Sequence, residues 1–361
     1  MLQIVDKKPS MLRKKAALFR KLYDNSTPKY IMGRNSYAKQ VITSFLKRNI
    51  ELAGIIDDYT SEVEYNGFPI FKTTDLSQNV LVISCVIEAR LITAINYLQQ
   101  NKISHILTYF DLVLHDKEHF PQVNFCENNI IDIEKNIEQY HWLYNIFDDD
   151  MSCKTLESLL DFRYNFDIGK MRIFSLRLDE QYYDVVGFSE KETFVDCGAY
   201  DGETTKRFVE LNPDYISAYV FEPSPDLYVK TCKKLHYYPN VYIHQCATYH
   251  ETTIQTFNSE KGSASGFSSD GNIKVKTVRL DDVIQEKVTY IKLDVEGAEY
   301  ETLLGAKRLI ETYKPKLAVC VYHNQEDFWR IPRLLLSYNQ NYRVLLRHYT
   351  EGFLETVMYF L

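Results

Sequence analysis

The sequence predicts an α/β protein with two parallel β-sheets, each covered by helices. Apolar strand-like segments alternate with helical segments in two separate series, one within residues 29–110 and one from Thr193 to the C-terminus. The 361 residues are enough for two domains at about 150 residues per domain. Hydrophobic residues make up 45% and charged residues 25%, which is the composition of an ordinary folded protein and argues against disorder.

The first expected element is an amphipathic helix at residues 9–23. Its apolar positions share one helical face, and its basic residues lie elsewhere: Leu12, Ala16, Phe19 and Tyr23 form the apolar face. We expect this helix to pack on its own domain. Weak peripheral contact of residues 9–23 with an anionic membrane surface is the alternative that the pattern leaves open.

A first domain is expected over residues 1–111. Its predicted strands are 29–33, 51–57, 80–85 and 103–110, and its predicted helices are 37–48 and 88–101. The segment KYIMGRNSYAKQVITSFLKRNIELAGIIDD resembles the Rossmann-like nucleotide-binding module of some sugar-modifying enzymes. Its glycine fingerprint is degraded: Gly33 is kept, but Asn35 puts a side chain where a pyrophosphate would pass, and Ala38 takes the third place.

Asp57 ends the second predicted strand and is a candidate ribose ligand. With the damaged loop, we expect weak or no NAD binding by this domain. A nucleotide or nucleotide sugar as ligand and a purely structural or dimerising role remain alternatives.

Residues 112–190 are aromatic and acidic, and we expect a helical connector or lid there. Helical spacing is present at 141–147 and 154–166. The acidic run Asp148–Asp150 is interpreted as the start of a helix rather than a metal site, because acidic residues suit a helix N-terminus.

The second domain, residues 191–361, is expected to hold a seven-stranded, doubly wound sheet with an antiparallel last strand. The predicted strands are 193–198, 217–223, 240–246, 288–294, 316–322, 342–348 and 355–361. The predicted helices are 203–211, 225–235, 298–313 and 325–338. Ligands of such a sheet bind at the carboxyl ends of its strands.

Three polar motifs fall at those carboxyl ends. FVDCGAYDGET places Asp196, Gly198 and Gly202 between a buried strand and a helix, a spacing that differs from the G-x-G-x-x-G phosphate loop. The Asp196 carboxylate would repel a pyrophosphate but would attract a cationic amino group. S-adenosylmethionine carries an ammonium and a sulfonium and has no phosphate.

The other two motifs carry further ionisable groups. VFEPSP ends a strand with Glu222, which is suited to accept hydrogen bonds from both ribose hydroxyls of an adenosine. In YIKLDVEGAEYETLLGA, strand alternation puts Lys292 and Asp294 on one side, with Glu296 in the following turn. Ionisable groups on a buried strand are costly unless they are paired or used, so either an internal salt bridge of Lys292 or a catalytic role explains them.

Together, FVDCGAYDGET, FEPSP, IKLDVEGAE, KPKLAVCVYH and RHY…ETVMY resemble the FkbM family of methyltransferases over roughly residues 150–361. The resemblance implies a class I, Rossmann-like, S-adenosylmethionine-dependent methyltransferase domain that O-methylates a hydroxyl, often on a carbohydrate. The implied cofactor-binding residues are Asp196, Gly198, Ala199, Tyr200, Gly202, Glu222, Pro223, Ser224 and Asp294. The implied catalytic residues are Asp294, His323, Glu296 and Lys292, with Asp294 the first candidate base and His323 the second.

The expected acceptor is a carbohydrate of a surface glycan or a nucleotide-sugar-derived precursor, or another small hydroxyl compound. The net charge of −7 argues against a nucleic acid partner, and no apolar stretch is long enough to span a membrane. Seven scattered cysteines and no apparent secretory leader favour the cytoplasm. No metal is expected, homo-oligomerisation stays open, and GSASGF (262–267) is either a closing loop or an exposed hairpin tip. A nicotinamide-dependent sugar oxidoreductase or epimerase and a non-catalytic glycan- or nucleotide-sugar-binding scaffold are the alternative functions.

Overall fold

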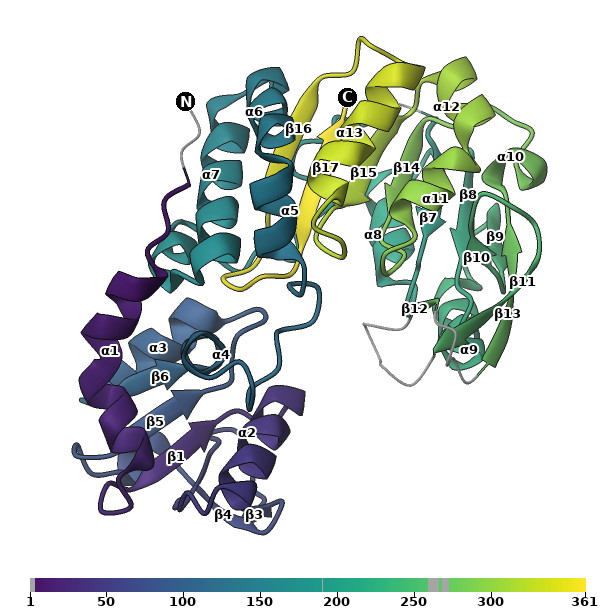
Figure 1. Cartoon of the computed structure of the whole chain (residues 1–361). Helices are drawn as coiled ribbons and strands as arrows, with labels where there is room; N and C mark the ends of the chain where they lie inside the picture. The colour runs from purple at the N-terminus through teal and green to yellow at the C-terminus, as the bar shows by residue number, and fades with distance from the viewer. Residues whose placement is uncertain (1–3, 190, 259–265, 268–272) are drawn as a thin grey trace. The chain divides into compact units, whose positions relative to one another are not determined.

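The computed structural model describes residues 4–189, 191–258, 266–267 and 273–361, and the chain divides into two compact units (Figure 1). Unit 1 comprises residues 1–135, 156–178 and 349–354. Unit 2 comprises residues 136–155, 179–348 and 355–361. The residues of the expected connector, 112–190, are divided between these two units.

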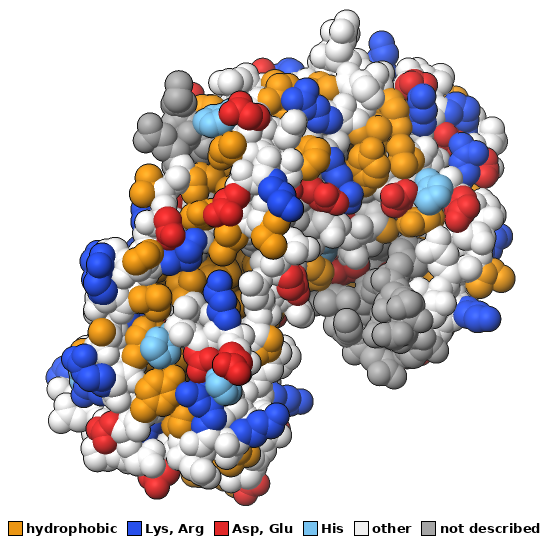
Figure 2. Space-filling view, in the orientation of Figure 1, with side chains coloured by type: hydrophobic (Ala, Val, Ile, Leu, Met, Phe, Trp, Pro, Cys, Tyr) orange, Lys and Arg blue, Asp and Glu red, His pale blue; other side chains and the backbone are white. Residues whose placement is uncertain are grey.

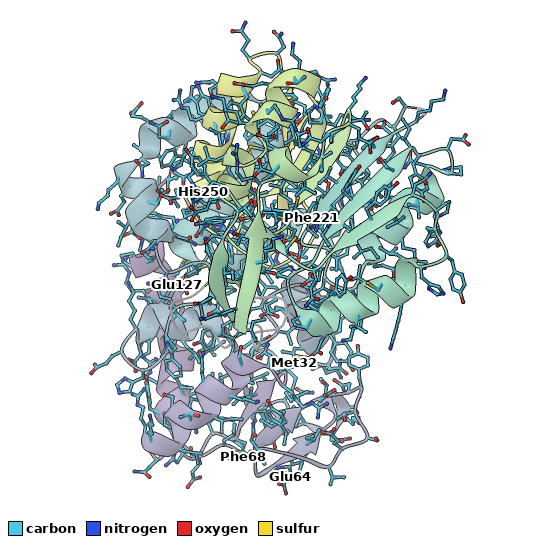
Figure 3. All side chains as sticks on the ribbon, turned by 90° about the vertical axis from the view of Figure 1, so that its right-hand side faces the viewer. Met32, Glu64, Phe68, Glu127, Phe221 and His250 are labelled. Atoms are coloured by element: carbon cyan, nitrogen blue, oxygen red, sulfur yellow. The ribbon has the colours of Figure 1, made fainter. Side chains whose placement is uncertain are left out.

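Unit 1 is built on a six-stranded sheet with the order β3-β4-β2-β1-β5-β6. Its strands are β1 (Lys29–Met32), β2 (Gly54–Ile56), β3 (Glu64–Tyr65), β4 (Phe68–Phe71), β5 (Leu81–Ser84) and β6 (Ile106–Thr108). All pairings are parallel except β3 with β4, which are marked by Glu64 and Phe68 in Figure 3. This hairpin was not predicted, although its Asn66-Gly67 turn, with φ of +48° and +82°, is a strong hairpin signal in the sequence.

The helices of unit 1 include the three predicted at 9–23, 37–48 and 88–101, but Tyr109 and Phe110, predicted to end the strand 103–110, begin a helix instead. The helices are α1 (Lys8–Tyr23), α2 (Ser36–Lys47), η1 (Thr73–Asp75), α3 (Leu91–Gln100), α4 (Tyr109–His115), α5 (Asn129–Lys135) and η2 (Ile168–Ile173). Helix α1 buries Phe19 and Leu22, and Lys15 donates to the buried Asp111 at 2.6 Å. The prediction that α1 packs on its own domain is thus confirmed.

Unit 2 contains the predicted seven-stranded sheet, with the order β16-β17-β15-β14-β7-β8-β9. The strands are β7 (Thr193–Cys197), β8 (Ser217–Phe221), β9 (Val241–His244), β14 (Tyr290–Leu293), β15 (Lys316–Cys320), β16 (Val344–His348) and β17 (Thr356–Phe360). Strand β17 runs antiparallel to both of its neighbours, as predicted. A second sheet, not predicted, joins β10 (Ala247–Thr248), β11 (Ile254–Asn258), β12 (Gly266–Phe267) and β13 (Ile273–Val278).

The remaining helices either precede the large sheet along the chain or connect strands of unit 2. They are α6 (Ile137–Ile146), α7 (Asp150–Asn165, divided between the units), α8 (Glu203–Leu211), α9 (Pro225–Leu235), α10 (Leu280–Val283), α11 (Glu299–Leu304), α12 (Lys307–Tyr313) and α13 (Asp327–Tyr338). The acidic run does begin a helix: Asp149 accepts the Ser152 N–H at 2.8 Å. The predicted helix 298–313 is interrupted between α11 and α12, where Gly305 lies so close to the Tyr249 carbonyl that a Cβ would approach that oxygen to 2.1 Å.

The chain leaves β7 toward β8 and β9 on one side, and leaves β14 toward β15 on the other. Right-handed crossovers then place α8 and α9 on one face of the sheet and α11 and α12 on the opposite face. The carboxyl ends of β7 and β14 consequently flank the topological switch point, where ligands of such sheets bind.

Two further expectations concern the segment GSASGF and the absence of a membrane-spanning stretch. Most of GSASGF, residues 262–265, lies outside the described residues, so its role stays a prediction. Among the described residues, no helix is both long enough and apolar enough to cross a membrane. On the face seen in Figure 2, Lys and Arg side chains are interspersed with Asp and Glu side chains.

The switch point depends on Gly198, whose φ is +79° and where an added Cβ would lie 1.8 Å from the Asp294 carbonyl oxygen. We expect Gly198→Ala to lower the free energy of unfolding by at least about 2 kcal/mol, since backbone strain and a steric clash add. Urea denaturation measures this. Gly187→Ala is the matched control, because no atom lies within 4 Å of its added Cβ. Equal stabilities of the two variants would contradict this role of Gly198.

Candidate active site

The carboxyl ends of four neighbouring strands carry the polar side chains of the site. Strand β7 supplies Asp196 and the loop at 198–202, and β8 leads to Glu222. Strand β14 supplies Lys292 and leads to Asp294, and the segment after β15 supplies His323. The sheet order therefore brings together motifs that are far apart in the chain.

Asp196 and Lys292 form a buried ion pair beneath the loop. The two residues are register partners on adjacent parallel strands, and Lys292 Nζ lies 3.1 Å from Asp196 Oδ1. Thr205 donates its hydroxyl to Asp196 Oδ2 at 2.6 Å, and Lys292 donates to the Gly198 carbonyl at 2.6 Å. Burial lowers the pKa of Lys292, but the charges of Asp196 and Asp294 raise it by more, so the lysine is a cation.

Of the two explanations given for Lys292, an internal salt bridge or a catalytic role, the structure contains the salt bridge. The Asp196 carboxylate has no exposed surface, and the contacts that the structure gives it are internal. A direct contact between Asp196 and a cofactor ammonium stays a prediction. The pair instead fixes the loop that starts at Gly198.

That loop is tied to the end of β8 by the Glu222 carboxylate. The backbone N–H of Tyr200 donates to Glu222 Oε2 at 2.9 Å, and that of Ser224 donates to Oε1 at 2.8 Å. Gly202, with φ of +83°, is the N-cap of α8, and Ala199 is buried. Burial raises the pKa of Glu222 to about 7, although both backbone N–H groups lower it.

Tyr200 and Pro223 complete the predicted cofactor segment. Tyr200 adopts a φ of +53°, and its side chain is 51% exposed beside the carboxyl ends of the strands. Phe221, which ends β8 (Figure 3), receives the N–H groups of Gly198 and Ala199 on its carbonyl. The cofactor contacts of Ala199, Tyr200, Pro223 and Ser224 stay predictions.

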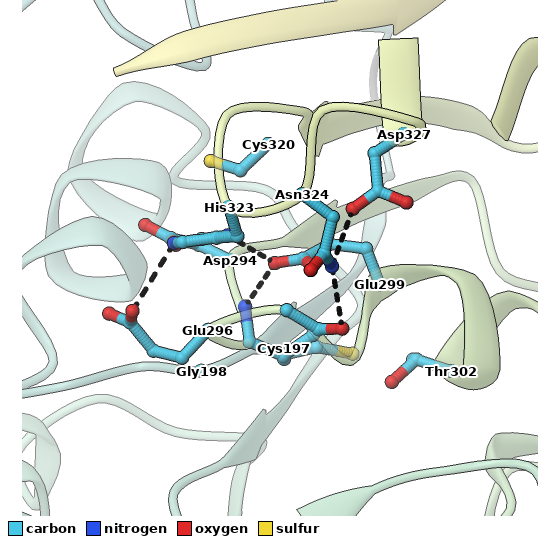
Figure 4. A network of polar contacts seen from close by, with 12 residues as sticks. Cys197, Gly198, Asp294, Glu296, Glu299, Thr302, Cys320, His323, Asn324 and Asp327 are labelled. Carbon is cyan, nitrogen blue, oxygen red and sulfur yellow. Dashed lines mark hydrogen bonds and ion pairs between the residues drawn. The ribbon is translucent and has the colours of Figure 1, made fainter. Parts of the chain in front are cut away.

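A cluster of acidic side chains surrounds His323 (Figure 4). His323 Nε2 lies 3.3 Å from Glu296 Oε2 and 3.6 Å from Asp294 Oδ1. On the other side of the ring, Nδ1 lies 2.8 Å from Glu299 Oε1. Both His323 and Glu299 are buried, whereas the Asp294 side chain keeps 22% of its surface exposed.

The charged groups of the cluster shift one another's pKa values. Burial lowers the pKa of His323, but Glu299 and Glu296 raise it by more, so the imidazole is positively charged at neutral pH. Burial raises the pKa of Glu296 to about 7, although His323 lowers it. Donor atoms of Asp294, Glu299 and His323 also lie within 4.8 Å of one another, close enough to hold a metal ion. This ligand set was not predicted from the sequence.

Three residues of this site were missed from the sequence. Tyr182 donates its hydroxyl to Asp294 Oδ2 at 2.9 Å. Burial and the negative charge of Asp294 raise the pKa of Glu355 to about 7. Glu299 lies shortly after Asp294, and the spacing in DVEGAE is its only sequence signal. Tyr182 carries none, whereas Glu355 is the first residue of the segment ETVMY, in which it was not singled out.

The predicted nucleotide loop of unit 1 is closed by its own side chains. Asn35 is the N-cap of α2: its Oδ1 accepts the Ala38 N–H at 3.0 Å, and its Nδ2 donates to the Cys85 carbonyl at 2.8 Å. Asp57, the candidate ribose ligand, pairs with Arg34 at 2.8 Å. The helix N-terminus that would receive a phosphate is therefore already capped.

Comparisons with known proteins place these observations in context. Residues 196–351 match the methyltransferase FkbM domain. A methyltransferase FkbM from Methylobacillus flagellatus KT has the same fold, with 23% identity, 98% coverage of both chains and a TM-score of 0.75. No curated protein matches the sequence significantly.

Two solved structures match part of the chain at lower similarity. An rRNA methylase from Streptococcus thermophilus is 14% identical, covers 48% of this chain and 86% of its own, and has a TM-score of 0.33. Fibrillarin from Aeropyrum pernix, in complex with S-adenosyl-L-methionine, is 11% identical, covers 48% of this chain and 67% of its own, and has a TM-score of 0.33.

The buried pair under the loop gives a stability prediction. We expect Asp196→Asn to lower the free energy of unfolding by about 3–5 kcal/mol, because Lys292 then keeps a buried charge without a countercharge. The double variant Asp196→Leu with Lys292→Met should recover most of that loss, since it removes both charges together. Urea denaturation measures all three proteins. A loss below about 1 kcal/mol in Asp196→Asn would show that the pair does not support the loop.

Proposed function

Because residues 196–351 match the methyltransferase FkbM domain, we propose that this chain is an S-adenosylmethionine-dependent O-methyltransferase that acts on a carbohydrate hydroxyl. The acceptor is a surface glycan or a nucleotide-sugar-derived precursor, which places the enzyme in glycan biosynthesis. That acceptor class is supported by the sequence resemblance. A cytoplasmic location is supported by the seven scattered cysteines, all of them in the described part of the chain and none in a disulfide bond.

The observation that carries the proposal is the convergence of Glu222, Asp294 and His323 on one switch point. Each Glu222 oxygen accepts one backbone N–H and keeps acceptor capacity for a ribose hydroxyl. An acidic cluster favours a cationic ligand and disfavours a phosphate. These features fit S-adenosylmethionine, which when bound supplies a methyl group on a positively charged sulfur.

The residues of the chain would hold the two reactants in position and provide a group that accepts the hydroxyl proton. The acceptor oxygen forms a new bond to the methyl carbon with a lone pair, the electrons of the broken C–S bond stay on sulfur, and the hydroxyl proton passes to a carboxylate. Asp294 is the first candidate for that carboxylate, since it ends the central strand and is partly exposed. His323 is the second, but an imidazole that is already protonated accepts no further proton.

The other charged residues of the site have supporting roles. Glu299 orients the His323 ring, and Lys292 acts through Asp196 rather than on substrate. Glu296, with its pKa near 7, is placed to exchange a proton at working pH. A nicotinamide-dependent reaction is disfavoured, because Asn35 caps the helix that would bind the phosphates.

Cofactor binding tests the role of Glu222. We expect Glu222→Ala to weaken S-adenosylhomocysteine binding by about 1.5–3 kcal/mol, because charge-assisted hydrogen bonds to the ribose are lost. In the unchanged protein, binding should tighten from pH 6 to pH 8, since the carboxylate ionises near pH 7. Glu222→Gln should remove that pH dependence. Isothermal titration calorimetry measures both effects.

Two controls accompany the calorimetry. Glu210→Gln removes an exposed carboxylate from α8 and should leave the affinity unchanged. Because folding raises the Glu222 pKa from 4.5 to about 7, this group makes the unfolding free energy fall as pH rises through that range, and Glu222→Gln should flatten the fall. Unchanged affinity in a folded Glu222→Ala protein would remove Glu222 from the site.

Methyl transfer tests the proton acceptor. We expect Asp294→Asn to keep S-adenosylhomocysteine affinity within a few fold and to lower turnover by at least about 10²-fold, since a general base contributes about 10²–10⁴-fold. Incorporation of labelled methyl groups into a panel of oligosaccharides and nucleotide sugars measures turnover. Glu210→Gln is again the control.

Three outcomes distinguish the alternatives. Nearly full turnover in Asp294→Asn together with loss in His323→Ala would make His323 the base. Retained turnover in both variants, with loss on chelation by EDTA, would contradict a metal-free mechanism and place the required cation away from Asp294, Glu299 and His323, since two of these three candidate ligands are changed. Binding of S-adenosylhomocysteine without transfer to any acceptor would favour a non-catalytic binding role.

A further inference from the structure

Tyr182 lies in the segment that precedes the large sheet, where the sequence shows no functional motif. Its side chain is only 6% exposed, and its hydroxyl donates to Asp294 Oδ2 at 2.9 Å. The same hydroxyl lies 3.3 Å from Cys320 Sγ. Because a phenol has one proton and a carboxylate is the better acceptor, the Cys320 thiol is the donor in that second contact.

The backbone of Tyr182 is held from both sides by strands of the sheet. Tyr290 of β14 donates its hydroxyl to the Tyr182 carbonyl at 2.6 Å. The Tyr182 N–H donates to the hydroxyl of Tyr359 of β17 at 3.0 Å. Tyr182 has a φ of +72°, an uncommon conformation that these two contacts fix.

The hydrogen bond from Tyr182 affects the orientation of the Asp294 carboxylate. Its two oxygens face different partners: Oδ2 faces Tyr182, and Oδ1 faces His323 Nε2 at 3.6 Å. An Asp side chain that is partly exposed can rotate away from a substrate unless one oxygen is held. Rotating Asp294 would leave the Tyr182 hydroxyl buried without its carboxylate acceptor, which is energetically costly.

We infer that Tyr182 is a positioning residue that fixes the orientation of the Asp294 carboxylate, with Oδ1 turned toward His323. The inference deepens the proposed methyl transfer and rests on it for its catalytic meaning. Tyr182 touches neither acceptor nor cofactor in this role and acts only through Asp294. The hydrogen bond from Tyr182 to Asp294, however, can be tested in the protein without any methyl transfer.

Turnover measures the catalytic consequence. We expect Tyr182→Phe to lower kcat about tenfold and to leave KM and S-adenosylhomocysteine affinity within about twofold, because alignment of the reactants is lost while their binding is not. Tyr183→Phe is the matched control: the adjacent tyrosine loses a hydroxyl that donates to the Thr204 carbonyl instead. Its kcat should stay within about twofold.

A double-mutant cycle separates positioning from general stability. In an Asp294→Asn background, Tyr182→Phe should have little further effect on kcat, since the carboxylate that it positions is already gone. Independent, multiplicative losses would contradict the inference. Should Tyr182→Phe not fold, Tyr290→Phe removes only the contact to the Tyr182 carbonyl and should lower kcat in the same direction by a smaller factor.

A spectroscopic test needs no acceptor and no turnover. In protein labelled at tyrosine ¹³Cζ, the Tyr182 signal, identified by its loss in Tyr182→Phe, should move in Asp294→Asn. The Tyr183 signal should stay in place. A Tyr182 signal that does not move would overturn the inference, whereas a moved signal in a protein that methylates no acceptor would overturn the proposed function and leave the hydrogen bond standing.

Discussion

The site depends on the contact between Gly198 and the backbone of Asp294 at the switch point of the sheet. Only a residue without Cβ can occupy this position, because a Cβ would come within 1.8 Å of the Asp294 carbonyl oxygen. The contact brings the loop that follows β7 directly against the end of β14. A cofactor loop and a candidate base therefore lie at one place in the fold.

Beneath this contact, the Lys292–Asp196 pair supports both strands. Lys292 also donates to the Gly198 carbonyl, so one cation links the strand ends to the loop above them. Such a buried pair is not a source of large stability, since desolvation offsets much of its attraction. Its contribution is specificity: the register of β7 with β14 is the one that places the two charges opposite each other.

The acidic cluster is built by a different principle. Glu299, the first residue of α11, accepts the Val295 N–H at 2.9 Å on Oε1, and the same oxygen lies 2.8 Å from His323 Nδ1. One side chain thus fixes the turn that follows Asp294 and orients the His323 ring. The charged imidazole in turn offsets part of the repulsion among the carboxylates of Asp294, Glu296 and Glu299. The cluster combines a backbone contact within the turn after β14 with a chemically useful arrangement.

The sequence by itself determined the large parallel sheets, the strand-end positions of Glu222 and Asp294, and the glycines of the β7 loop, because periodicity and turn chemistry are local. It left the Lys292 salt bridge as one of two interpretations, and it did not reveal Tyr182 or Glu355, which lie far from β14 in the chain. Only the tertiary structure decided those, since register and sheet order set which distant side chains meet. Burial, which is also a tertiary property, decided that Asp196 faces Lys292 and Thr205.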